Sequence, residues 1–165
     1  MQAKKRFGQN FLTDRKLLED LVSLIKVSDQ DKFLEIGPGK GDLTESLINL
    51  CDSYFGVEVD KDLLVFLRNK FPENKKAFID GDILKLHPSK IYSSNKFRVV
   101  GNIPYNISSP ILEWCEKHYE KIYDIHFMLQ KEFALRCAGS ERTSSYSRLS
   151  VICNYLYEVT ILKEV

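Results

Sequence analysis

The stretch Phe33-Leu34-Glu35-Ile36-Gly37-Pro38-Gly39-Lys40-Gly41 joins a short apolar run to a glycine-rich turn, and a helical pattern follows over residues 42–50. Glycine lets the backbone approach a ligand closely, and the start of a helix favours a negative group. The spacing is Gly-x-Gly-x-Gly and lacks the last glycine of the dinucleotide fingerprint. The turn indicates a ligand site, but a strand-to-helix connection that binds nothing remains an alternative.

Apolar and polar stretches alternate along the whole chain in the manner of successive strand–helix units. Helical spacing is found at residues 14–27, 42–50, 63–71, 108–119, from 131 to 137, and at 149–156. Strands are expected at residues 33–36, 54–59, 77–79, 97–100, 125–129 and 159–162. This order predicts an α/β fold with a mostly parallel central sheet and helices on both faces, in one domain over residues 1–165.

Acidic residues follow the second and third expected strands, where a parallel sheet binds its ligands. Glu58 lies 19 residues after Gly39, and a carboxylate there accepts hydrogen bonds from two vicinal ribose hydroxyls. Asp82 follows the third strand and offers an acceptor for an adenine amine. An adenosine-containing ligand accounts for the glycines and both acids together, whereas chance surface acids account for each one separately.

The fourth expected strand leads into Asn102-Ile103-Pro104-Tyr105. Proline fixes φ and biases the residue before it toward an extended conformation. A rigid turn that presents an amide carbonyl and an aromatic ring suits an amine on a planar base, although Asn and Pro also dominate ordinary turns. A nicotinamide dehydrogenase has no need of this turn. The four strand ends together therefore favour S-adenosylmethionine as cofactor and a nucleobase as methyl acceptor.

The bulk composition is that of an ordinary soluble domain, with 44% hydrophobic and 28% charged residues and a net charge of +1. A basic run, Lys4-Lys5-Arg6, is a candidate contact for RNA phosphates or else a solvated surface. The four cysteines and three histidines show no metal-ligand or disulfide spacing, so we expect no metal. Reduced thiols and the lack of a long apolar run predict a cytoplasmic protein without membrane association.

The chain resembles the KsgA-type ribosomal RNA adenine dimethyltransferases, which are related to the erythromycin-resistance rRNA methyltransferases. The resemblance rests on stretches spread along the chain, which are Lys5 to Leu12, Glu35 to Gly39, Glu58 to Asp60, Gly81-Asp82, Gly101 to Tyr105, Gln130 to Glu132 and Tyr146 to Ser150. Gly-Gln-Asn-Phe-Leu near the start and Asn-x-Pro-Tyr are far more specific together than either is alone. The resemblance implies a Rossmann-like, class I S-adenosylmethionine-dependent methyltransferase fold.

The resemblance also implies roles for individual residues. In the cofactor site, Asn10 and Leu12 would close over the cofactor, Gly37 and Gly39 would pass beside its methionine portion, Glu58 would hold the ribose, and Asp82 the adenine. In the acceptor site, Asn102 would line the point of methyl transfer beside the cofactor, Pro104 would shape the turn, and Tyr105 would stack on the target base. Lys4, Lys5 and Arg6 would contact the RNA.

The implied activity is dimethylation of the N6 amine of adenines near the 3′ end of 16S rRNA, with S-adenosyl-L-homocysteine as product. The implied partner is the small ribosomal subunit or its precursor, acted on by a monomer. Alternatives are a resistance-type 23S rRNA methyltransferase, a small-molecule or protein methyltransferase, and a scaffold that keeps the fold without catalysis. The family continues beyond the last expected strand, so we expect this sequence to lack a C-terminal helical domain and the second aromatic group that would sandwich the base.

Overall fold

The computed structural model describes residues 15–92, 96–141 and 143–165, so Asn10, Leu12 and the Lys4-Lys5-Arg6 run lie outside the described residues. The chain divides into two compact units, residues 1–128 and 129–165. No helix in the described ranges has both the length and the apolar character needed to cross a membrane.

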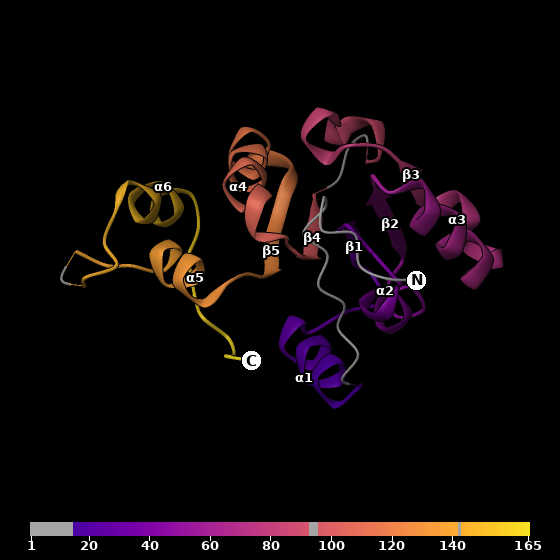
Figure 1. The fold of residues 1–165 in the computed structure, drawn as a ribbon, viewed down its shortest axis with the longest axis horizontal. Helices are drawn as coiled ribbons and strands as arrows, with labels where there is room; N and C mark the ends of the chain where they lie inside the picture. Colours follow the sequence, from indigo (N-terminus) through magenta and orange to yellow (C-terminus); the bar gives the residue numbers. More distant parts are fainter. Residues whose placement is uncertain (1–14, 93–95, 142) are drawn as a thin grey trace. The chain divides into compact units, whose positions relative to one another are not determined.

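The first unit contains a five-stranded parallel sheet in the order β3-β2-β1-β4-β5 (Figure 1). The strands are β1 (Lys32–Ile36), β2 (Ser53–Glu58), β3 (Phe78–Asp80), β4 (Phe97–Asn102) and β5 (Ile122–Met128). The α-helices of this unit are α1 (Arg15–Ile25), α2 (Asp42–Leu47), α3 (Lys61–Lys70) and α4 (Ser108–Lys117). The five described strands of this sheet confirm the predicted parallel arrangement.

Short 3-10 helices occupy several of the connections. They are η2 (Pro72–Ala77), η3 (Ile83–Lys85), η4 (Pro88–Lys90), η5 (Tyr105–Ile107) and η6 (Tyr119–Lys121). Two of them, η3 and η4, lie in the stretch that the sequence predicts as a polar connection between the third and fourth strands. Asp82 and His87 cap these turns, because their side chains accept from the N–H groups of Leu84 and Ser89.

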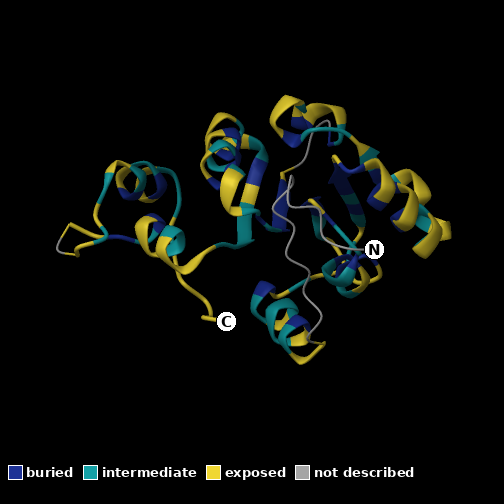
Figure 2. Ribbon diagram, viewed as in Figure 1, coloured by how far each residue is buried: buried dark blue, intermediate teal, exposed yellow. Residues whose placement is uncertain are grey.

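One face of the sheet packs against α1, α2 and α3. Side chains alternate along a strand, so Phe33 of β1 shares this face with Tyr54 of β2 and Phe78 of β3. These rings form one buried cluster with Ile25, Leu47 and other apolar residues of the three helices. Most residues of β1, β2 and β4 are buried, whereas β5 is mostly half-buried (Figure 2).

The opposite face is covered by the η3–η4 segment and α4. Phe55 and Phe97 point to this face, and both contact the ring of Tyr92, with centroids 5.4 and 5.3 Å apart. Tyr92 donates a hydrogen bond to the Phe33 carbonyl at 2.9 Å, and Trp114 of α4 donates to the Leu86 carbonyl at 2.8 Å. Helices on both faces of the sheet are therefore confirmed, as the strand–helix alternation predicts.

Arg98 of β4 joins the amino-terminal edge of the sheet to the end of α1. Its guanidinium donates to Asp31 at 2.6 Å, to Asp124 at 2.8 Å and to the Ile25 carbonyl at 2.6 Å, and the side chain is only 9% exposed. Burial alone would raise the pKa of Asp124, but hydrogen bonds from His126 and Arg98 outweigh it and lower that pKa. The buried cation is thus fully compensated by acids and helix carbonyls.

The second unit consists of α5 (Lys131–Cys137) and α6 (Arg148–Leu156), joined by the predicted loop. The Ser150 hydroxyl, fully buried, donates to the Arg136 carbonyl at 2.6 Å. The Asn154 amide donates to the Gly139 carbonyl at 3.1 Å, and the thiols of Cys137 and Cys153 share a hydrogen bond. Hydrogen bonds from side chains of α6 therefore connect this helix to α5 and to Gly139, which follows α5.

The predicted strand at residues 159–162 is wrong. Residues 158–165 carry no regular structure and pair with no described strand, and Ile161 and Leu162 are exposed. A strand needs a neighbour to take up its backbone hydrogen bonds, and an apolar pattern alone does not supply one.

We expect Arg98→Ala to destabilise the protein by about 3 kcal/mol, because it removes a buried cation and leaves the two half-buried acids Asp31 and Asp124 without it. Urea unfolding followed by circular dichroism measures this effect. Lys96→Ala, an exposed change just before the same strand, is the matched control and should cost less than about 0.5 kcal/mol. An Arg98→Ala variant as stable as this control would show that the cluster contributes nothing.

Candidate active site

Residues from four loops line one cavity at the carboxyl ends of the strands. It has a volume of about 270 Å³ and is lined by Glu35 to Lys40, Asp42, Leu43, Val57 to Val59, Gly81 to Leu84, Asn102, Pro104, Asn106 and Ile107. The strand order reverses between β1 and β4, and ligands of open α/β sheets bind beside that reversal. The cavity therefore lies where the topology predicts a site.

The glycine turn after β1 forms the floor of this cavity. Gly37 and Gly39 have φ of 66° and 63°, a left-handed conformation that favours glycine. Among the described residues, no atom lies within 4 Å of a Cβ placed on Gly37, so that part of the chain leaves space beside this backbone. The sequence prediction that this turn brings bare backbone to a ligand is consistent with this geometry.

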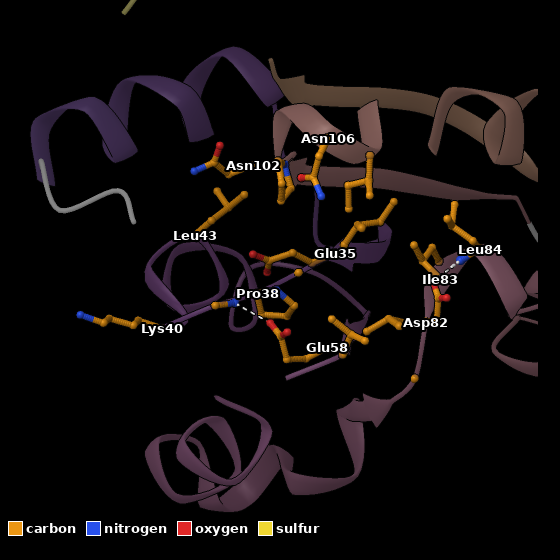
Figure 3. A pocket seen from close by; sticks show the side chains of 18 of the residues that line it. Glu35, Pro38, Lys40, Leu43, Glu58, Asp82, Ile83, Leu84, Asn102 and Asn106 are labelled. Carbon is orange, nitrogen blue, oxygen red and sulfur yellow. Dashed lines mark hydrogen bonds between the residues drawn. The ribbon is translucent and has the colours of Figure 1, made fainter. Parts of the chain in front are cut away.

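Glu58 is held at the end of β2 by two backbone N–H groups. One carboxylate oxygen accepts from Gly39 at 3.1 Å, shown dashed in Figure 3, and the other accepts from Asp60 at 2.9 Å. Burial raises the pKa of Glu58, while these two N–H groups act to lower it. Each oxygen keeps lone pairs, so the carboxylate can accept from two neighbouring hydroxyls.

Glu35 is a buried acid to which the sequence interpretation gave no role. It is 2% exposed, and one oxygen accepts hydrogen bonds from the hydroxyls of Tyr54 at 2.5 Å and Thr44 at 2.8 Å. Burial is the main cause that raises its pKa from 4.5 to about 7. The sequence feature that could have identified Glu35 is an acidic residue within an apolar strand, just before the glycines.

Asp82 lines the cavity but is partly engaged elsewhere. One of its oxygens accepts from the Leu84 N–H at 3.0 Å, and the other lies 3.8 Å from the ammonium group of Lys85. The apolar side chains of Val59 and Leu84 are 50% and 39% exposed at the same end of the cavity. Exposed apolar side chains such as these offer surface on which a planar ring can pack.

The Asn-x-Pro-Tyr turn extends from β4 and forms the opposite end of the cavity. The Ile103 N–H continues the sheet by donating to the Met128 carbonyl at 3.0 Å. The Pro104 carbonyl accepts from the Ile107 N–H at 3.1 Å and from the Ser108 hydroxyl at 3.2 Å. Asn102 and Pro104 line the cavity, whereas Tyr105 is 65% exposed and is absent from its lining.

The structure thus brings together Gly37, Gly39, Glu58, Asp82 and Asn102, which the sequence predicts for the cofactor. It adds Glu35, Val59, Leu84 and Asn106, which sequence reasoning missed as site residues. Across residues 15–92, 96–141 and 143–165, no three His, Cys, Asp or Glu side chains gather in a way that could hold a metal ion.

Comparison with known proteins settles the family. The chain matches the family described as ribosomal RNA adenine dimethylase over residues 1–165. The chain belongs to this family. Its fold is that of class I S-adenosylmethionine-dependent methyltransferases, and the KsgA-type resemblance is confirmed.

Two curated relatives are named ribosomal RNA small subunit methyltransferase A. The protein of Methylobacillus flagellatus is 42% identical over 93% of this chain, and that of Coxiella burnetii is 42% identical over 98% of it. These alignments cover 59% and 63% of the relatives' own lengths, so the chain spans about three fifths of each.

Two solved structures are also similar to this chain. A dimethyladenosine transferase from Plasmodium falciparum matches with a TM-score of 0.72 and 28% identity, over 87% of this chain and 51% of that one. The 23S rRNA methyltransferase ErmE matches with a TM-score of 0.71 and 31% identity, over 86% of this chain and 56% of that one.

We expect Glu35→Gln to change the pH dependence of stability. The folded protein holds the Glu35 proton up to about pH 7, whereas the unfolded chain releases it near pH 4.5. The contribution of Glu35 to stability is therefore fully present below pH 4.5 and is lost as pH rises to about 7. A pKa difference of this size between the folded and unfolded states changes the free energy of unfolding by about 3 kcal/mol.

Unfolding by urea at a series of pH values from 4.5 to 8 measures this dependence. Gln keeps an oxygen that accepts from Tyr54 and Thr44 but does not titrate. The variant should therefore gain stability relative to the unaltered protein as pH rises. A constant difference between the two proteins across this range would contradict the buried, titrating carboxyl.

Proposed function

We propose that this protein transfers methyl groups from S-adenosylmethionine to the N6 amine of two adjacent adenines near the 3′ end of 16S rRNA. The observation that carries the proposal is that Glu58 of β2 and Asn102 of β4 line a single cavity beside the β1–β4 reversal. The Glu58 carboxylate can accept hydrogen bonds from ribose hydroxyls, and the Asn102 side-chain oxygen can accept from an amine. The names of the 42% identical relatives support the small-subunit target.

The lining of the cavity fits the proposed cofactor. The Glu58 carboxylate offers acceptors for both ribose hydroxyls, and Val59 and Leu84 offer apolar surface for adenine. The backbone at Gly37 gives room for the methionine portion. Once Glu35 has lost its proton, which burial delays to about pH 7, its carboxylate would favour a positive charge at this end of the cavity.

When bound, S-adenosylmethionine supplies a methyl group on a positively charged sulfur, so the protein need not provide a nucleophile. A new N–C bond forms as the C–S bond breaks, sulfur keeps the electron pair, and the methylated amine releases a proton to water. The residues of the chain act by placement and by hydrogen bonding. The same step repeated on one amine gives dimethyladenine.

The Asn102 turn would orient the target amine by accepting its hydrogens. The Asn102 side-chain oxygen is one acceptor. The Pro104 carbonyl already accepts two hydrogen bonds within the chain, so the Ile103 carbonyl is favoured as the second. Accepting both hydrogens holds the nitrogen lone pair toward the methyl group. The exposed ring of Tyr105 would stack on the base, which contributes roughly 1–3 kcal/mol.

The other expected features remain proposals. Asn10 and Leu12 are proposed to close over the cofactor and Lys4, Lys5 and Arg6 to contact phosphates, all outside the described residues. The protein is proposed to act as a cytoplasmic monomer on the small subunit or its precursor. The resistance-type 23S rRNA methyltransferase is the second candidate, because ErmE shares 31% identity and this fold.

Asn102→Ala should abolish methyl transfer and leave cofactor affinity within a few-fold, since Asn102 acts on the amine. Mass spectrometry of rRNA from both ribosomal subunits, together with calorimetric titration of S-adenosylmethionine, measures both effects. Methylation confined to the large subunit would support the resistance-type alternative. Normal methylation by the Asn102→Ala variant would contradict the role of Asn102 as an acceptor for the target amine.

Glu58→Gln should weaken binding of S-adenosylmethionine by roughly 10- to 100-fold, because a charged acceptor is replaced by a neutral group with only one oxygen. The same calorimetric titration measures it. Asp62→Asn, an exposed change four residues along the chain, is the matched control and should leave the affinity unaltered. Equal affinities of the two variants would remove Glu58 from the cofactor site.

A further inference from the structure

We propose that Asn106 is a second substrate-contacting residue, whose amide N–H group donates to a ring nitrogen beside the target amine of adenine. The inference rests on the proposed function and deepens it. Asn106 directly follows the Asn-x-Pro-Tyr turn, and its side chain lines the same cavity as that of Asn102. Figure 3 shows both side chains at the end of the cavity away from Asp82.

The local backbone fixes where Asn106 lies. It is the middle residue of η5, which is closed by the hydrogen bond from the Ile107 N–H to the Pro104 carbonyl. The Ser108 hydroxyl donates to the same carbonyl, and Ser108 is buried at the start of α4. The position of the Asn106 backbone relative to Asn102 is therefore set by a hydrogen-bonded turn that leads directly into α4.

The chemistry of adenine calls for a donor at this place. Its N6 amine offers only hydrogens, and the two ring nitrogens that flank it, N1 and N7, only accept. The Asn102 side-chain oxygen and the Ile103 carbonyl supply acceptors for the amine. With its oxygen on the amine, the Asn102 amide can donate to at most one of the two ring nitrogens, and the Ile103 carbonyl cannot donate at all, so the other ring nitrogen still needs a donor. A side-chain amide carries both a donor and an acceptor, so Asn106 can complete the recognition of the base edge.

The second methyl transfer depends most on this contact. The first transfer replaces one amine hydrogen by a methyl group, so the monomethylated base keeps a single hydrogen for the two acceptors of the turn. Its orientation then relies more on the ring contact and on stacking against Tyr105. Loss of the Asn106 donor should therefore slow the second transfer more than the first.

The test is a time course of mono- and dimethyladenosine, measured by mass spectrometry, with the full-length protein and small subunits that lack the modification. Asn106→Ala and Asn106→Asp should both accumulate monomethyladenosine, with the second transfer slowed about five- to tenfold. Aspartate matches asparagine in size and accepts, but it cannot donate as a carboxylate. Both variants should bind S-adenosylmethionine within a few-fold of the unaltered protein.

Ser109→Ala is the matched control, since Ser109 is exposed on the next turn and is absent from the cavity lining. It should give the product ratio of the unaltered protein. An unaltered ratio in Asn106→Asp would overturn the donor role, and a loss of cofactor affinity as large as the loss of rate would make Asn106 merely structural. No methylation by the unaltered protein would overturn the proposed function itself, and the inference with it.

Discussion

The pairing of β1 with β4 is the contact on which the site depends. These two strands run side by side, with Glu35 opposite Val100, although half of the first unit separates them in sequence. A Cβ on Gly101 would lie 2.8 Å from the Ile36 carbonyl oxygen, so only glycine allows the strands to approach this closely. Their two loops, one with the glycines and one with Asn102, consequently open into the same cavity.

Electrostatics at this junction is governed by two buried carboxyl groups whose surroundings differ. Glu58 accepts hydrogen bonds from two backbone N–H groups, whereas the donors to Glu35 within the described part of the chain are the hydroxyls of Thr44 and Tyr54. Backbone N–H groups are fixed by the fold and cannot turn away, but hydroxyls can rotate. The cavity therefore contains one carboxylate with a fixed geometry and one acid whose charge responds to what lies beside it.

Much of the fold could be predicted from the sequence, because its signals are local. The apolar run before Gly37 and the acid at Glu58 each mark a strand end, and parallel strands bring their carboxyl ends to one edge. The strand predicted at residues 159–162 failed because pairing depends on a neighbour, which no local pattern reveals.

The residues that line the candidate site could be predicted in part for the same reason. Residue types at strand ends identified Asp82 and Asn102, but sequence does not show which hydrogen bonds are already taken. One oxygen of Asp82 accepts from the Leu84 N–H, and the Pro104 carbonyl accepts from two donors. These hydrogen bonds depend on the geometry of the turns that follow, which the sequence does not show. Asn106 was missed because its place in the cavity lining depends on the direction of a 3-10 turn.

The closed turn that follows β4 has a consequence for the entropy of recognition. Tyr105 is largely exposed, yet the backbone on either side of it is fixed by the sheet and by the first turn of α4. Only two side-chain torsions remain to be ordered when a base stacks on such a ring. If Tyr105 stacks on a base as proposed, most of the order that this contact requires is therefore established when the protein folds, before the base binds.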